Sequence, residues 1–248
     1  MNAPLRGIGW VTAAGAGRGR AGEPFAWEAG VLPRLAGHPV FDESVPRAGR
    51  MDEFSRLGFA AVALALRDSG LGEGREKRPV GVAASSTYGC LATDRDYFDT
   101  VVPHEGRLAS PNLFAYTLPN CFLGEAAIRF GLTGPSLVVS ERRPAGLEPL
   151  RLALESLAWG EAEAMLCGVC DLPAPAGLAA PQALPPGAVF LVLGGRPSAS
   201  GCEPYGEVSV ARGAGVCLDG APVDSLFTLV ANALAARARS PGRLPRCT

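Results

Sequence analysis

Cysteine thiols are the side chains of this sequence best suited to act as nucleophiles, and two of the seven stand at suggestive places. Cys121 opens an apolar segment that we expect to be helical, and a helix N-terminus lowers the pKa of a thiol. Cys90 follows a predicted strand. No histidine lies near Cys121 in the sequence to act as its base, although residues distant in sequence can meet in a fold. We expect both thiols to pack in the interior, with catalysis by Cys121 as the alternative.

Cys167 and Cys170 form a CxxC pair, which invites a zinc or redox interpretation. A zinc site needs a second ligand pair at matching spacing, and the sequence has none. A redox pair needs its first cysteine exposed at a helix N-terminus. Both residues instead lie in an apolar predicted strand, on opposite faces of it. We predict two buried, inert thiols and no metal.

Three further patterns are weak indications of a functional site. Gly7 and Gly9 begin a dinucleotide fingerprint, but Thr12 stands where the third glycine belongs, so we expect a tight turn and no cofactor. The two histidines, His38 and His104, lie in predicted loops and are expected at the surface. Ser85 follows a strand without the GxSxG pattern that a hydrolase elbow requires.

Composition excludes several classes of function. The 248 residues are 48% hydrophobic and carry a formal net charge of −1. This balance argues against nucleic acid as the main partner and against intrinsic disorder. The apolar runs are too short for a membrane span, and the N-terminus has no apolar stretch typical of a signal peptide. We therefore expect one cytoplasmic domain, residues 1–248, with reduced thiols.

Hydrophobic periodicity predicts strands that alternate with helices. The expected strands are 5–12, 79–85, 135–140, 163–170, 188–194 and 205–211, the last two as a pair. The expected helices run from Met51 to near Gly70, over 93–102, from Pro119 to Phe130, through Leu147–Leu157, and from a cap at Asp224 or Ser225. Residues 13–50 and 172–187 are expected to be loops, the first with one short helix. This alternation predicts an α/β fold with a mostly parallel sheet covered by helices on both faces.

Several motifs occur in an order that one enzyme family shares. They are Ile8-Gly9 with Val11-Thr12, Met51-Asp52 with Phe54-Ser55-Arg56-Leu57, Val80-Gly81-Val82, Asn120 with Gly124, Gly131-Leu132-Thr133-Gly134-Pro135-Ser136, and Ala164-Met165-Leu166-Cys167-Gly168 with Asp171. Together they resemble the N-terminal half of β-ketoacyl synthases, the condensing enzymes of the thiolase fold. The resemblance covers about residues 5–171 in register, and residues 172–248 diverge from it.

The resemblance breaks at the nucleophile. In the family, the Gly-Pro-Ser turn leads through a strand to a catalytic cysteine in a Thr-Ala-Cys context. Counting forward without gaps, Arg143 occupies that position. A guanidinium stays protonated and offers no nucleophilic lone pair. Pro144 also removes a backbone N–H from a turn in which the family uses backbone donors.

The family's second half is also missing from the resemblance. Catalytic synthases continue into a similar half that carries two histidines and a lysine, whereas no histidine follows His104 here. The resemblance therefore implies no catalysis by this chain alone. It implies a ketosynthase-like subunit of the chain-length-factor type, paired with a catalytic ketosynthase in fatty-acid, aryl-polyene or polyketide synthesis.

By resemblance, residues 112–123 occupy the region of the dimer interface. The residues expected to contact a partner are Asn112, Leu113, Phe114, Tyr116, Leu118, Asn120 and Phe122. Their apolar members suit a surface buried by another chain, and they suit this chain's own core equally well. Periodicity does not separate the two interpretations.

Two alternatives stay open. One is an acyltransferase or hydrolase that uses Cys121 or Cys90 as a relocated nucleophile. The other is a homodimer that binds an acyl carrier protein or acyl-CoA, in which Arg142 and Arg143 hold a phosphate or carboxylate. A solvated turn is the simpler interpretation of the two arginines.

Overall fold

The computed structural model describes residues 1–41, 45, 48–71, 75–141, 145–178, 184–195, 203–210 and 215–239. In this part of the chain one sheet runs in the order β4-β3-β5-β6-β1-β7-β8-β9, and β2 pairs with β1 off this path. The strands are β1 (Asn2–Thr12), β2 (Gly15–Arg18), β3 (Val80–Ser85), β4 (Ser136–Val139), β5 (Ala164–Asp171), β6 (Gly187–Gly194), β7 (Gly206–Val210), β8 (Val216–Leu218) and β9 (Ala221–Pro222).

The helices are α1 (Glu53–Ser69), α2 (Leu91–Val101), α3 (Pro111–Phe114), α4 (Cys121–Phe130), α5 (Glu148–Ala158) and α6 (Leu226–Ala238). Short 3₁₀ turns are η1 (Gly19–Ala21), η2 (Pro39–Phe41) and η3 (Val102–His104). Each helix expected from the sequence is present within a few residues of its predicted ends. Residues 13–50 were expected to form a loop with one short helix. In its described part this segment contains the strand β2 and two 3₁₀ turns, η1 and η2, so the prediction was incomplete.

Strand directions agree with the expected fold class and refine it. β3 pairs in parallel with β4 and with β5, whereas β6 lies antiparallel between β5 and β1. β1, β3, β4 and β5 therefore share one direction, as expected of an α/β fold. The two strands predicted over 188–194 and 205–211 exist but do not pair with each other, because β1 lies between them.

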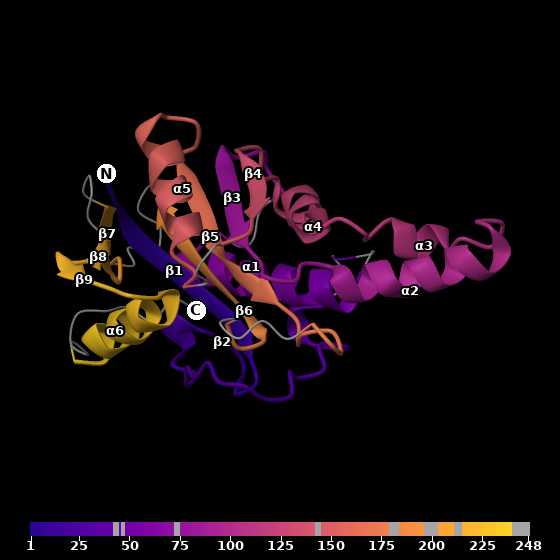
Figure 1. Cartoon of the computed structure of the whole chain (residues 1–248). Helices are drawn as coiled ribbons and strands as arrows, with labels where there is room; N and C mark the ends of the chain where they lie inside the picture. The colour runs from indigo at the N-terminus through magenta and orange to yellow at the C-terminus, as the bar shows by residue number, and fades with distance from the viewer. Residues whose placement is uncertain are drawn as a thin grey trace.

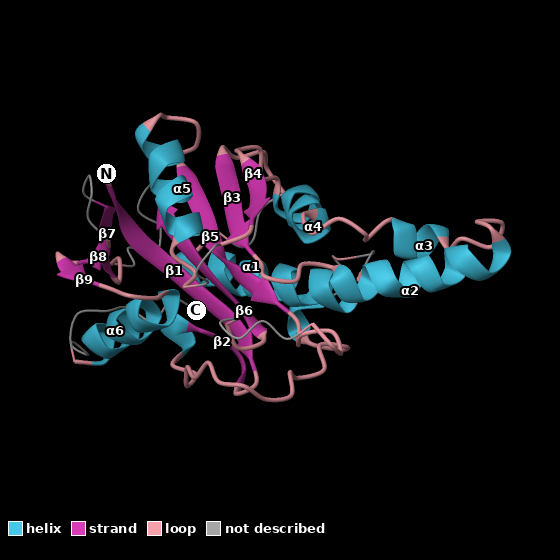
Figure 2. Cartoon of the chain, viewed as in Figure 1, coloured by secondary structure: helices cyan, strands magenta, loops and turns pink. Residues whose placement is uncertain are grey.

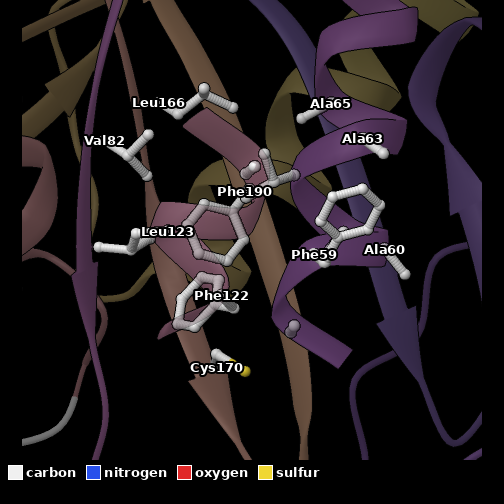
Figure 3. Close-up of a cluster of buried hydrophobic side chains, with 14 of the residues drawn as sticks. Phe59, Ala60, Ala63, Ala65, Val82, Phe122, Leu123, Leu166, Cys170 and Phe190 are labelled. Carbon is white, nitrogen blue, oxygen red and sulfur yellow. The ribbon is translucent and has the colours of Figure 1, made fainter. Parts of the chain in front are cut away.

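Helices cover both faces of the sheet (Figure 1 and Figure 2). The first core cluster lies on one face, where α1 and α4 pack on β3, β5 and β6. Its aromatic centre is Phe122, which lies beside Phe190 in Figure 3. The Phe122 ring lies 6.0 Å from that of Phe190 and 5.6 Å from that of Phe54. On the other face, α5 and α6 pack on β1, β5 and β6 in a second cluster.

Both ends of α1 carry the local signals that define a helix. The Asp52 side chain accepts a hydrogen bond from the Ser55 N–H, and Gly70 ends the helix in a left-handed conformation. Nearly the whole circumference is buried between β1, β6 and α4. Because a helix that is apolar on all sides belongs to an interior, α1 is the central support of the fold.

Gly7 and Gly9 lie within β1 rather than in the tight turn expected from the sequence. A Cβ added to Gly9 would lie 2.2 Å from the backbone nitrogen of Ala65, and one added to Gly7 would lie 2.4 Å from the Ala65 carbonyl oxygen. The two glycines therefore allow α1 to approach the strand closely. The turn prediction was wrong because the reason for the glycines is a contact some 60 residues away in sequence.

None of the helices in the described ranges is long and apolar enough to cross a membrane.

Candidate functional site

The candidate site lies at the carboxyl ends of three parallel strands. Ser85, the last residue of β3, is in register with Val139 of β4 on one side and with Val169 of β5 on the other. Loops that follow such strand ends are the usual place for ligand and catalytic groups in α/β folds. The loop after β4 also contains Arg143, which the resemblance stated above places at the nucleophile position.

Asp171 anchors the turn that leaves β3. Its Oδ1 accepts hydrogen bonds from the Ser86 hydroxyl at 2.8 Å, the Thr87 N–H at 2.8 Å and the Tyr88 N–H at 3.0 Å. Burial raises the pKa of the Asp171 carboxyl, and these hydrogen bonds oppose the rise only in part. The carboxyl therefore holds the turn in shape, and its lone pairs are already engaged by protein donors.

Glu141, the second residue after β4, accepts hydrogen bonds in the same way as Asp171. Its Oε1 accepts a hydrogen bond from the Ser85 hydroxyl at 2.9 Å. Its Oε2 accepts from the N–H groups of Ala145 and Gly146, at 2.9 and 3.0 Å. One carboxylate thus joins the end of β3 to the residues that lead into α5.

Arg142, Arg143 and Pro144 lie outside the described residues, so the structure does not test the sequence-based interpretation of Arg143. The described flank of this loop packs under α6. The Leu226 N–H donates to the Ala145 carbonyl oxygen at 2.8 Å, and Gly146 is buried with φ of 72°. The start of α6 therefore packs against Ala145 and Gly146, the residues that lead into α5.

The surroundings of the two candidate thiols favour the protonated, neutral form of each. Cys121 is half-buried and donates its Sγ hydrogen to the Ala115 carbonyl oxygen at 3.2 Å. Burial, together with the charges of Asp52 and Glu125, raises its pKa. Cys90 is buried, and burial with the nearby Asp94 raises its pKa to about 12. The expected burial in the interior is confirmed for Cys90, which is 3% exposed. It is confirmed only in part for Cys121, which is half-buried.

The histidines are not hydrogen-bonded to a cysteine within the described ranges. The His38 Nδ1 accepts from the Val40 N–H at 3.2 Å, and burial with the charge of Arg67 lowers the pKa of the ring. His104 is exposed in η3, as expected, whereas His38 is only half-exposed. The predicted buried state of the CxxC thiols is confirmed, because Cys167 and Cys170 are fully buried in clusters on opposite faces of the sheet.

The residues expected at a partner interface divide into two groups. Phe122 is 0% exposed in the core, and Tyr116 is 7% exposed and donates its hydroxyl hydrogen to Glu125. For these two the own-core interpretation is correct, since their burial requires no partner. The group left at the surface comprises Asn112, Phe114, Leu118 and Asn120, with Leu113 half-exposed.

Phe114 and Leu118 belong to a larger surface feature that we call the arm, residues 91–118. The arm contains α2, η3 and α3 and extends away from the sheet (Figure 1). In α2 only Thr93 is buried, and in α3 no residue is. Five large apolar side chains of the arm are more than 60% exposed, namely Phe98, Val102, Leu108, Phe114 and Leu118.

Sequence reasoning missed the role of Glu141 and gave none to Asp171. A usable signal was present, since Glu141 and Asp171 stand at or just after the ends of predicted strands that run in parallel. The carboxyl ends of parallel strands meet at one edge, so acidic residues there are placed together. No local pattern shows that the Glu141 and Asp171 carboxylates each accept hydrogen bonds from two backbone N–H groups of a nearby loop.

Comparisons with known proteins agree with this geometry. Residues 28–182, more than half of the chain, match the family model described as β-ketoacyl synthase, N-terminal domain. The chain is 34% identical over 122 residues to 3-oxoacyl-[acyl-carrier-protein] synthase 2 of Vibrio cholerae, covering 49% of this chain and 30% of that protein. It is 30% identical over 154 residues to the ketoacyl synthase alpha subunit of the tetracenomycin polyketide synthase of Streptomyces glaucescens, covering 56% and 36%. The chain thus spans about a third of the length of these curated relatives.

Solved structures show the same fold. One match is a chain in the structure of a type II polyketide synthase acyl-carrier protein in complex with its ketosynthase. It has a TM-score of 0.64 at 20% identity and covers 84% of this chain and 68% of the other. The ketosynthase ApeO in complex with its chain length factor ApeC, from Xenorhabdus doucetiae, contains a chain that matches with a TM-score of 0.54 at 19% identity. That match covers 79% of this chain and 80% of the other, so the two chains are about equal in length. The protein belongs to the β-ketoacyl synthase family and has the thiolase-like fold of its N-terminal domain.

Proposed function

We propose that this chain is a non-catalytic ketosynthase-like subunit that pairs with an active β-ketoacyl-[acyl-carrier-protein] synthase in fatty-acid or polyketide-type synthesis. The proposal rests on Arg143, the residue that falls at the family's cysteine position when the sequence is counted forward without gaps from the Gly-Pro-Ser turn, in a chain that belongs to the family. A permanently protonated guanidinium cannot accept an acyl group from a thioester. The acyl chemistry would then belong to the partner's active site.

The cysteines give little support to relocated chemistry. A thiol must ionise to attack a thioester, and the environments of Cys121 and Cys90 both oppose ionisation. In the described ranges neither thiol has a histidine partner to act as base. The alternative of an acyltransferase or hydrolase is therefore less favoured than the subunit role.

The arm supports the pairing. Five large apolar side chains that are more than 60% exposed on one extension of the fold are costly to leave in water. The Phe114 ring lies 5.5 Å from that of Tyr97, which joins α3 to α2 in one surface. Aromatic residues at the centre of such a surface are typical of protein interfaces. We infer that this surface, rather than Phe122 or Tyr116, contacts the ketosynthase.

A comparison also agrees with a role in a pair of ketosynthase-like chains. One matched chain of about equal length occurs in a solved complex of a ketosynthase with its chain length factor. An acyl carrier protein enters this proposal only through the partner, to which it would deliver the growing acyl chain. We expect no cofactor for a subunit with this role.

Native mass spectrometry of the chain co-expressed with the ketosynthase encoded nearest to it tests the proposal. We expect a 1:1 or 2:2 complex. Phe114→Asp and Leu118→Asp place charges on the arm and should shift the population to free subunits. Trp159→Asp is the matched control, because Trp159 is 71% exposed at the end of α5, outside the arm.

A chain that stays monomeric beside the synthase would overturn the proposal, as would a homodimer that excludes the synthase. Intact mass after incubation with an acyl thioester provides the second test. We expect an unmodified chain, and an acyl adduct lost in Cys121→Ala would replace the subunit role with the acyltransferase alternative.

A further inference from the structure

The arm is held to the rest of the chain through its two ends. Within residues 91–118 only Thr93 and Tyr116 are buried, at 6% and 7% exposure. Thr93 lies in the first turn of α2, and Tyr116 lies just before the arm returns to α4. Between these two residues the arm extends away from the sheet (Figure 1). Its direction therefore depends on the contacts that Thr93 and Tyr116 make.

Asp52 connects the start of the arm to the start of α1. As the N-cap of α1, its Oδ1 accepts a hydrogen bond from the Ser55 N–H at 2.9 Å. Its Oδ2 accepts the hydroxyl hydrogen of Thr93. Hydrogen bonds with an ionised acceptor are about twice as strong as those between neutral groups. One carboxylate thus ties the first turn of α2 to a helix that is buried on nearly all sides.

The other end of the arm is tied to α4. Tyr116 donates its hydroxyl hydrogen to the Glu125 Oε1 at 3.0 Å. The Cys121 thiol donates to the Ala115 carbonyl oxygen at 3.2 Å. Glu125 and Cys121 belong to α4, which packs on α1 in the first core cluster. Both ends of the arm are therefore fixed to α1, directly or through α4.

Contacts inside the arm make it one body. The Thr100 hydroxyl donates to the Tyr97 carbonyl oxygen at 2.7 Å and accepts from the Ser110 N–H at 3.0 Å. The Phe114 ring lies against that of Tyr97. A helix such as α2, of 11 residues, is about 16 Å long, so a small change of angle at its first turn displaces its far end by several times as much.

We propose that Asp52 and Thr93 anchor the arm and fix the direction in which it presents Phe98, Val102 and Phe114, each more than 60% exposed. Thr93 is then a positioning residue, because its own side chain is buried and acts through the arm. The anchor concerns contacts inside one chain. Its importance for a partner rests on the proposed pairing with a ketosynthase.

Distance measurements on the isolated chain test the anchor. Nitroxide labels on p-acetylphenylalanine at the exposed positions of Arg107 and Ala158 report the separation of the arm from α5 by double electron–electron resonance, without use of the seven cysteines. In Thr93→Val we expect the distance distribution to widen about twofold, because a hydrogen bond to a charged group is lost at nearly constant side-chain size. Thr93→Ser keeps the hydroxyl and should keep the original width. Thr133→Val is the matched control, since it removes an exposed hydroxyl that donates to the Arg78 carbonyl oxygen outside the arm.

An unchanged width in Thr93→Val would overturn the anchor, and so would an equal widening in Thr93→Ser. If Thr93→Val does not fold, Tyr116→Phe provides the same test at the other end of the arm, where the hydrogen bond to Glu125 is lost. We expect a wider distribution there too, and an unchanged one would show that these end contacts do not set the direction of the arm.

Titration of the synthase with the same variants tests the step that rests on the proposed pairing. If about a tenth of the Thr93→Val molecules hold the arm in its anchored direction, the dissociation constant should rise about tenfold. Thr93→Ser and Thr133→Val should bind as the original chain does. Unchanged affinity of Thr93→Val with a widened distribution would overturn the role of the anchor in pairing. If the original chain does not bind the synthase, the proposed function fails, while the distance measurement still decides the anchor.

Discussion

The Tyr205 hydroxyl donates a hydrogen bond of 2.7 Å to the Asp68 Oδ2, across 137 positions of sequence. The same carboxylate oxygen accepts from the Ile8 N–H at 2.9 Å, and Oδ1 accepts from the Arg20 N–H at 2.6 Å. One buried carboxyl of α1 thereby joins the first strand to the segment that precedes β7. Burial raises the pKa of Asp68 and, with the neighbouring Asp68 charge, that of Tyr205.

Tyr205→Phe removes one hydrogen bond from this buried carboxyl without changing the ring that packs beneath Arg20. We expect the free energy of unfolding to fall by about 1–3 kcal/mol, the cost of an unmet hydrogen bond to a buried charged group. Urea unfolding followed by circular dichroism measures it. Tyr97→Phe is the control, because Tyr97 lies half-exposed on the arm, and its effect should stay within about 0.5 kcal/mol. Equal effects of the two variants would contradict the importance of the Asp68 contact.

The Asp171 carboxyl makes stability depend on pH. Burial raises its pKa, so the folded chain binds this proton at a higher pH than the unfolded chain does. The contribution of this group to the free energy of unfolding is therefore complete below its unfolded pKa, about 3.9, and falls as pH rises through the folded pKa. Asp171→Asn removes the titration, so the difference in stability between the original chain and this variant should shrink from pH 4 to pH 7 in urea titrations. A difference that grows with pH would mean a lowered pKa.

Cys121 should behave as an ordinary or weak nucleophile. Its pKa is raised by burial and by the Asp52 and Glu125 charges, so the thiolate fraction at neutral pH is small. Alkylation by iodoacetamide, read by mass spectrometry, should accelerate about tenfold per pH unit up to pH 9 without a plateau. Cys90 should stay unmodified in the folded chain. A plateau below pH 8 at Cys121 would identify an activated thiol and restore the relocated-nucleophile hypothesis.

Glycine substitutions should separate close packing from free space. In Gly9→Ala the new Cβ would meet the Ala65 backbone nitrogen at 2.2 Å, so α1 must move and the chain should lose several kcal/mol or fail to fold. Gly124→Ala is the matched variant, because Gly124 lies exposed in α4 with no atom within 4 Å of an added Cβ. There the change should stabilise the helix by about 0.5–1 kcal/mol. Thermal unfolding of both variants measures the contrast, and a tolerated Gly9→Ala would refute the close approach of α1.

Phe122 and Phe114 test the division of the predicted interface. Phe122→Ala empties a fully buried site between Phe54 and Phe190 and should cost about 3–5 kcal/mol. Phe114→Ala removes a side chain that is 61% exposed and should change the free energy of unfolding by less than about 1 kcal/mol. Chemical denaturation of the isolated chain measures both. Comparable costs at the two positions would place Phe114 in the core as well.

Much of the secondary structure follows from local pattern. Phe54, Leu57, Ala61, Leu64 and Ala65 recur at helical spacing, and α1 runs where they predict it. The buried strands β3, β5 and β6 are short apolar runs with a Gly or Pro within four residues of each end. The short elements β2, β8 and β9 were missed because two to four residues show no period, and unlike the four-residue β4 with its Leu-Val-Val run they contain no run of three bulky aliphatic residues.

The hydrophobic pattern did not separate the apolar side chains that are buried in the core from those that are exposed at the surface. Phe114, Tyr116, Leu118 and Phe122 are all apolar or aromatic within nine positions, yet two are buried and two are exposed. The difference arises where the chain passes from the arm to α4, since Phe122 faces α1 while Phe114 lies on an extension that the sheet does not reach. Hydrophobicity states only that a side chain gains from burial, and does not say which surface buries it.

The sequence by itself determined the alternation of strands and helices, the motifs of the β-ketoacyl synthase family and the presence of arginine at position 143. Only the tertiary structure decided that Gly9 accommodates α1, that Phe122 is core, and that Ala145 is hydrogen-bonded to Glu141 and Leu226. The physical reason is that these contacts depend on strand order and on helix placement over the sheet. Those are properties of the whole packed chain, whereas composition and periodicity act over a few residues.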